Sequence, residues 1–167
     1  MVYIAKEDFD NYPNFSKFVL DFVPKVVGEP KILRSMGLAA FMTHQIFDFE
    51  IIQKTAASLT TGKPPRIIPT VFSDHSLAAE YKHVEQYILI NAIHARKFDD
   101  NPDVPGYRKY IKATLLHELV HHWDYIADEE FQDHEIRGEK KIRKDEVEER
   151  GHVLERLAFG GTTAMIP

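Results

Sequence analysis

A single long helix, predicted over residues 107–128, constrains this chain more than any other part of its sequence. Leucines and isoleucines recur at helical spacing on one side of this helix, which indicates that this side is buried against a core. The opposite side carries polar residues and two histidines, a pattern typical of a helix that lines a cleft. The polar side consists of Tyr110, Thr114, His117, His121, Asp124 and Asp128, and the apolar side of Ile111, Leu115, Leu119 and Ile126.

The polar side contains the pattern His-Glu-Leu-Val-His at positions 117–121. Residues four apart on a helix project from the same side, so His117 and His121 can bind one zinc ion (Zn2+). Glu118 lies about 100° round the helix from His117. There a carboxylate can accept a proton from a water molecule held at the open position of the ion. The alternative interpretation is a solvated stripe on which two histidines occur by coincidence.

The motif and the residues after it, His-Glu-Leu-Val-His-His-Trp-Asp, resemble the active-site helix of the zincin metallopeptidases. The resemblance covers residues 107–161 and implies that His117 and His121 bind zinc, that Glu118 is the general base, and that a third ligand lies downstream. One zincin subgroup has a histidine where this chain has Ala127, and a cysteine ligand is impossible because the chain has no cysteine. The remaining arrangement is that of the gluzincins, in which a glutamate on a later helix completes the site.

A later helix is predicted over residues 145–158, and it carries the candidate third ligands. Glu155 follows Gly151 by one helical turn, and a glycine at that place lets two helices approach closely enough for a Zn–O bond of about 2.0–2.2 Å. Glu148 shares that side of the helix and is the second choice, whereas Glu149 faces elsewhere. A solvated surface charge is the alternative interpretation of Glu155. Two further candidates are Glu146 and His134.

Other polar residues are expected to support the site. Asp124 follows His121 by one turn, and ligating histidines usually donate their second ring N–H to a carboxylate or carbonyl. His122 lies about 140° round the helix from His117, so we expect it to be structural or to line the rim. Hydrolysis of an amide also needs a donor to the tetrahedral oxyanion. The candidates for that donor are His152, Tyr110 and Tyr107.

The remaining elements predict an α+β fold. Residues 1–30 are rich in aromatics and are expected to lie as a segment against the core. The elements predicted between this segment and the long helix are one long or two broken helices over 31–60, a strand over 66–72, a short helix over 75–83, a strand over 87–93 and a loop over 99–106. Together with the resemblance, they predict one zincin-like domain over residues 1–167. It is mostly helical, with a small twisted sheet above the active-site helix.

Composition narrows the partners and the compartment. The net charge of -5 disfavours nucleic acid, which requires a basic surface. No apolar run is long enough to span a membrane, and the first residues lack a secretory signal. We therefore expect neither a nucleic-acid nor a membrane partner, and a protein that is cytoplasmic or exported by a signal-independent route. The sequence makes no prediction about oligomeric state.

The motif and the resemblance together predict a zinc metallopeptidase that hydrolyses peptide bonds. Its substrate is a peptide or protein, which would pair as an extended chain with one of the two predicted strands. The alternative is a zincin-like module or effector domain in which zinc is structural and nothing is hydrolysed. Structural zinc sites are normally closed by four ligands and prefer cysteine, whereas this sequence offers three good ligands and no cysteine.

Overall fold

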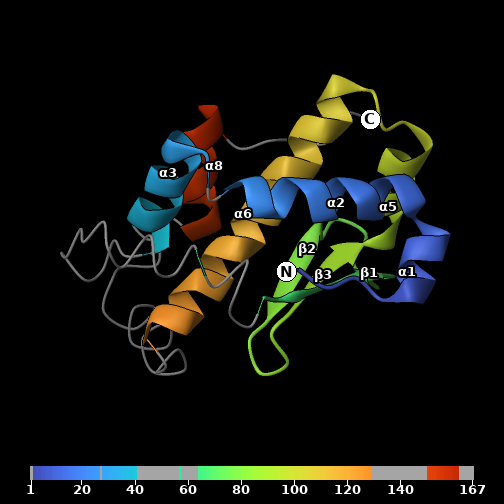
Figure 1. Cartoon of the computed structure of the whole chain (residues 1–167), viewed down its shortest axis with the longest axis horizontal. Helices are drawn as coiled ribbons and strands as arrows, with labels where there is room; N and C mark the ends of the chain where they lie inside the picture. The colour runs from blue at the N-terminus through green and yellow to red at the C-terminus, as the bar shows by residue number, and fades with distance from the viewer. Residues whose placement is uncertain (1, 27, 41–56, 58–63, 129–149, 162–167) are drawn as a thin grey trace.

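The computed structural model describes residues 2–26, 28–40, 57, 64–128 and 150–161. Within these residues the fold is α+β, mostly helical with one small mixed sheet, as the sequence predicts. The long helix α6, Pro105–Asp128, runs through the middle of the molecule (Figure 1). It packs against the sheet on one side and against helices α3 (Pro30–Ala40) and α8 (Arg150–Phe159) on the other.

Three strands form the sheet of the described residues: β1 (Arg66–Thr70), β2 (Ala79–Lys82) and β3 (Tyr87–Asn91). Their order is β1-β3-β2, with β1 parallel and β2 antiparallel to β3. The strand predicted over 87–93 is therefore central and is not an edge, which corrects one of the two alternatives left open by the sequence. The N-terminal segment bridges the outer side of β1, where the Ile67 N–H donates to the Tyr3 carbonyl at 3.1 Å.

The helix predicted over 75–83 is wrong, because this segment forms a turn followed by β2. The Asp74 carboxylate accepts hydrogen bonds from the backbone N–H (2.8 Å) and hydroxyl (2.6 Å) of Ser76. These hydrogen bonds stabilise the turn locally. The chain then pairs with β3, and the carbonyl of Ala78 accepts a hydrogen bond from the N–H of Asn91 at 2.9 Å. An N-cap residue can close a turn without starting a helix.

Asn91 joins three elements at one end of the sheet. Its side-chain amide donates to the Leu77 carbonyl at 2.9 Å, and its side-chain oxygen accepts from the Ile93 N–H at 3.0 Å. The second bond caps α5 (Ala92–Asp100), a helix that the sequence analysis did not predict. The strand predicted as far as residue 93 consequently ends at Asn91.

The described residues of the N-terminal segment, which was expected to lie against the core, form two helices: α1 (Lys6–Asn11) and α2 (Pro13–Val26). Helix α2 buries residues at helical spacing, among them Phe15, Val19 and Phe22, which explains the aromatic content as a core face. Its first turn is capped from a distant part of the chain. Asp99 Oδ1, at the end of α5, accepts from the N–H of Asn14 at 2.7 Å and of Phe15 at 3.0 Å.

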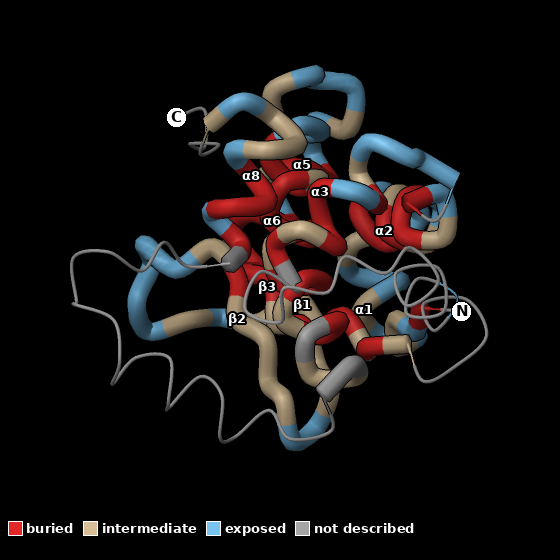
Figure 2. Tube along the Cα trace, turned by 90° about the vertical axis from the view of Figure 1, so that its left-hand side faces the viewer, coloured by how far each residue is buried: buried red, intermediate tan, exposed pale blue. Residues whose placement is uncertain are grey.

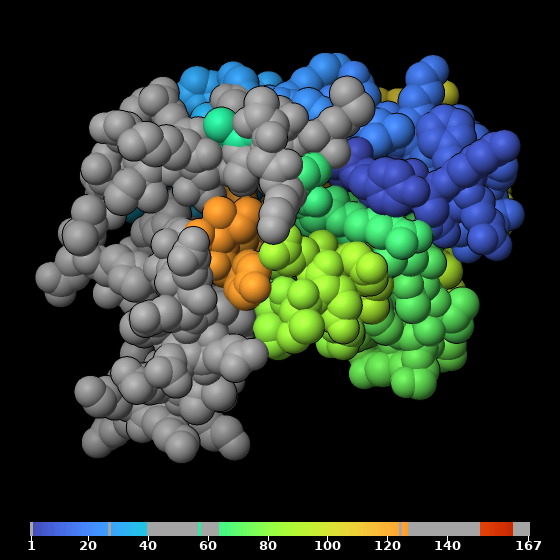
Figure 3. Space-filling model, turned by 60° about the horizontal axis from the view of Figure 1, so that its bottom comes forward, coloured from blue at the N-terminus to red at the C-terminus, as the bar shows by residue number. Residues whose placement is uncertain are grey.

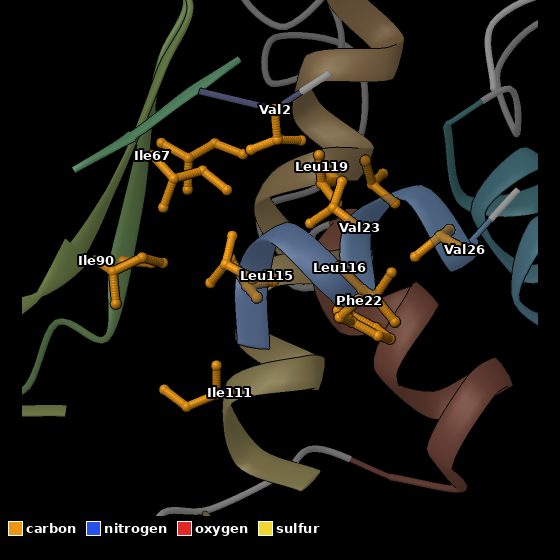
Figure 4. Close-up of a cluster of buried hydrophobic side chains, with 14 of the residues drawn as sticks. Val2, Phe22, Val23, Val26, Ile67, Ile90, Ile111, Leu115, Leu116 and Leu119 are labelled. Atoms are coloured by element: carbon orange, nitrogen blue, oxygen red, sulfur yellow. The ribbon is translucent and has the colours of Figure 1, made fainter. Parts of the chain in front are cut away.

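The hydrophobic core lies between α6, α2 and the inner face of the sheet. Leu115 and Leu119 of α6 point towards Ile67 and Ile90, with Val23 of α2 beside them (Figure 4). Buried residues are concentrated along α6 and the helices that surround it (Figure 2). The core therefore fixes α6 on several sides at once. A helix needs such support if it is to hold reactive groups in place.

Parts of two predicted helices fall outside the described residues. Helix α3 accounts for the beginning of the helical region predicted over 31–60, and α8 for the later part of the helix predicted over 145–158. No described helix combines the length and the apolar character that crossing a bilayer would require.

We expect Asp99→Ala to lower the free energy of unfolding by about 2 kcal/mol, because it removes the carboxylate acceptor of two backbone N–H groups in the first turn of α2, one of them buried. Asp100→Ala, which changes the exposed neighbour, should alter stability by less than about 0.5 kcal/mol. Urea denaturation followed by circular dichroism measures both. Equal effects of the two substitutions would show that the cap contributes nothing specific.

Candidate metal centre

The two histidines of the motif lie on the same side of α6, where helical geometry places them. The ring centroids of His117 and His121 are 5.5 Å apart and the ring planes are inclined by 52°. Both rings are partly exposed, whereas Glu118 between them is only 6% exposed. The motif thus presents two accessible imidazoles with a sheltered carboxylate next to them.

Helix α8 approaches this side of α6 at Gly151. A Cβ atom at this position would lie 2.2 Å from Cγ and Cδ2 of the His117 ring and 2.3 Å from Cε1. Real Cβ atoms essentially never come so close to a ring, so only glycine is compatible with this approach. The close approach that the sequence analysis expected at Gly151 is present.

The approach brings Glu155 against His117. Nδ1 of His117 lies 2.9 Å from Oε1 of Glu155, although the two residues are 38 positions apart in the sequence. Glu155 is only 8% exposed, so its carboxylate is held inside the helix packing and does not extend into solvent. A carboxylate has two oxygens, and a contact with the imidazole therefore leaves it able to bind a metal ion as well.

A third imidazole reaches the same place from α8. His152 lies three residues before Glu155, and its ring centroid is 5.3 Å from that of His117, with the planes at 80°. Donor atoms of His117, His152 and Glu155 all lie within 4.8 Å of one another. The donors of a tetrahedral zinc ion are roughly 3.5 Å apart for bonds of about 2.0–2.2 Å, so small side-chain movements suffice to close these three around one ion.

The set of donors differs in part from the set predicted. His117 and Glu155 come together, and His121 lies beside His117, but the nitrogens of His121 do not share the spacing of the other three donors. His152, which the sequence indicated only as a candidate oxyanion donor, is the third member of this group. The signal for it was available, because residues three apart on a helix share a side. The other candidate ligands, Glu146, Glu148, Glu149 and His134, lie outside the described residues, as does the side chain of Asp124.

Tyr110 forms part of the buried wall next to Glu155. Burial raises the pKa of its hydroxyl above the ordinary value, a hydrogen bond with Thr114 lowers it in part, and the charge of Glu155 raises it further. The hydroxyl therefore stays protonated at neutral pH. His94 of α5 packs edge-on against this ring, with centroids 5.1 Å apart, and desolvation lowers the pKa of its imidazole. No pattern in the sequence indicates this contact, because His94 is the only histidine in its segment.

His122 turns away from the cluster, as expected from its position on the helix. It is fully buried, and its Nδ1 lies 3.1 Å from the hydroxyl of Tyr81 on β2. Burial raises the pKa of Tyr81, so this hydroxyl remains a neutral partner. Two neighbouring histidines of α6 thus differ in their surroundings. His121 lies beside His117, and His122 connects the helix to the sheet.

Comparison with known proteins agrees with this chemistry. A model of the family described as metallopeptidase toxin 3 matches residues 8–160. No curated protein matches the chain. No solved structure matches it either.

We expect Gly151→Ala to lower the zinc affinity of the protein at least about tenfold, because the added methyl group must displace the His117 ring or the whole of α8. Gly28→Ala is the matched control, since among the described residues a Cβ there meets Lys25 O alone, at 3.4 Å, an ordinary contact. Competition with a chromophoric chelator measures the affinity, and circular dichroism checks the fold. An unchanged affinity in Gly151→Ala would mean that the His117 position is irrelevant to metal binding.

Proposed function

The chain belongs to the metallopeptidase toxin 3 family, and we propose on that premise that it is a toxin effector that hydrolyses peptide bonds with the help of zinc. The observation that carries this proposal is the contact of 2.9 Å between His117 on α6 and Glu155 on α8. This contact brings the helix with the His-Glu-x-x-His motif together with a glutamate from a later helix, as a zinc site of this kind requires. The substrate class is a peptide or protein.

We assign His117, His121 and Glu155 as the residues that hold the metal. Two imidazoles and a carboxylate are ordinary zinc ligands, and a set of three leaves one position open, as catalytic sites do. The buried carboxylate also balances part of the charge that a divalent cation brings into the protein. When bound, zinc acts as a Lewis acid and lowers the pKa of a coordinated water from 15.7 to about 7.

Glu118 acts as the general base in this proposal. Glu118 follows His117 directly in the sequence and is almost completely buried, so its side chain is held in place instead of moving freely in solvent. It accepts a proton as the water attacks the peptide carbonyl and then delivers that proton to the leaving amine. The protonated hydroxyl of Tyr110 is next to Glu155 and is a candidate donor to the oxyanion.

A non-catalytic zinc-binding module is the second candidate function. The observation that favours it is the additional imidazole of His152, since structural zinc sites are closed by four protein ligands. In such a module Glu118 would be a buried structural acid. The two candidates therefore differ in what the carboxylate of Glu118 is needed for.

We expect Glu118→Gln to bind about one zinc per chain and to lose peptidase activity on casein or a peptide library by at least about 10²-fold, since the amide cannot accept a proton. His117→Ala should lose the metal, because a ligand is removed. Elemental analysis and a cleavage assay measure these outcomes. Wild-type activity in Glu118→Gln would rule out the catalytic proposal and leave the zinc-binding module.

The outer edge of β2 is the best place in the described structure for an extended substrate. Helix α6 packs against this strand, and the C-terminal part of α6 is visible at the surface beside the β2–β3 hairpin (Figure 3). Because Ala78 O bonds to β3, the alternation of antiparallel pairing directs the backbone groups of Ala79 and Tyr81 outward. The other edge strand, β1, is bridged at Arg66 by the N-terminal segment.

A cleaved peptide should therefore bind β2 through every second amide. We expect N-methylation at alternate positions of such a peptide to weaken its binding roughly fivefold to tenfold, the equivalent of one hydrogen bond, with little effect at the positions between. Competition against an unmodified substrate measures each affinity. If the affinities of the N-methylated peptides do not alternate along the sequence, the peptide does not pair with β2 as a strand.

A further inference from the structure

The first turns of α8 place two potential ligands on one side of the helix. His152 and Glu155 are three residues apart, so both project towards α6, and Gly151 lets the His117 ring lie between the helices. The His152 ring stands nearly perpendicular to that of His117, at a centroid separation of 5.3 Å. Potential donors from two helices are therefore gathered in one place.

We propose that His152 is itself a ligand of the metal ion held by His117 and Glu155, and that it occupies the remaining position of the centre until substrate arrives. This proposal rests on the proposed function, because it takes for granted that a metal ion binds here. It adds a ligand that neither the motif nor the gluzincin pattern contains. The resting centre then has three imidazoles and one carboxylate.

Burial decides which of these ligands can leave. Glu155 is buried, His117 and His121 are partly exposed, and His152 is exposed. An exposed imidazole that leaves the ion regains hydrogen bonds with water, whereas a buried carboxylate that leaves the ion gains no comparable hydration. His152 is therefore the ligand that gives way, and its departure provides the open position that hydrolysis requires.

The alternative role of His152 is that of a neighbour that never touches the ion. It predicts a different set of donors, with a water molecule in place of the His152 imidazole, and the visible spectrum of bound cobalt changes when an imidazole is exchanged for water. The measurement requires no substrate and no catalytic activity.

The test compares the cobalt-substituted wild-type protein with His152→Ala and His152→Gln, and uses His75→Ala as the control. His75 is an exposed histidine in the turn before β2, outside the donor cluster. We expect both substitutions at position 152 to change the visible cobalt spectrum and to lower zinc affinity at least about tenfold in chelator competition. His75→Ala should match the wild type in both measurements.

The outcomes separate this inference from the proposed function. If the wild-type protein binds metal and both variants at position 152 keep its cobalt spectrum, His152 is not a ligand and the assignment of His117, His121 and Glu155 stands. If the wild-type protein binds neither cobalt nor zinc, both proposals fail together. A changed spectrum in both variants, with the control unchanged, supports His152 as a ligand.

Discussion

The close packing of α8 against α6 at Gly151 is the constraint on which the candidate metal centre depends. The two helices can meet there only because position 151 has no side chain, and the imidazole of His117 fills the space that a Cβ would take. This contact positions Glu155 against His117 and His152 beside it. A carboxylate buried at a helix interface without such a partner would carry a large desolvation cost, so the same contact that positions the donors also makes their burial tolerable.

Helix α6 can carry this centre because its other sides are occupied as well. Its apolar residues pack on the sheet and on α2, and His122 contacts Tyr81 of β2. The β2 strand is held in turn by Asn91, whose backbone and side chain bind the segment just before it. The proposed substrate edge on β2 and the candidate metal centre on α6 must keep a fixed separation if a peptide bound at the edge is to reach the metal ion. The contact between Tyr81 and His122 joins these two elements directly.

The sequence predicted those features that follow from local periodicity. The long helix, the side of it that carries His117 and His121, and the need for glycine near Glu155 all derive from the angle of 100° per residue, and the structure contains the helix and the close approach. Features that depend on distant parts of the chain were missed. The cap of α2 comes from Asp99, 85 positions away from Asn14. Strand β2 forms because its residues pair with β3, which overrides the helix predicted over 75–83. No pattern within a short window contains such information.

The same difference between local and distant information applies to the proposed metal ligands. A motif identifies the donors that one helix supplies, but the number of ligands in the assembled centre depends on how a second helix is rotated about its own axis. Here the rotation that brings Glu155 to His117 must also bring His152, because residues three apart share a helix side. Turning α8 to remove His152 would move Glu155 as well and would lose the fit at Gly151. The presence of His152 is therefore a geometric consequence of the helix orientation that positions Glu155. A catalytic centre of the proposed kind would have to let the exposed histidine leave the metal ion.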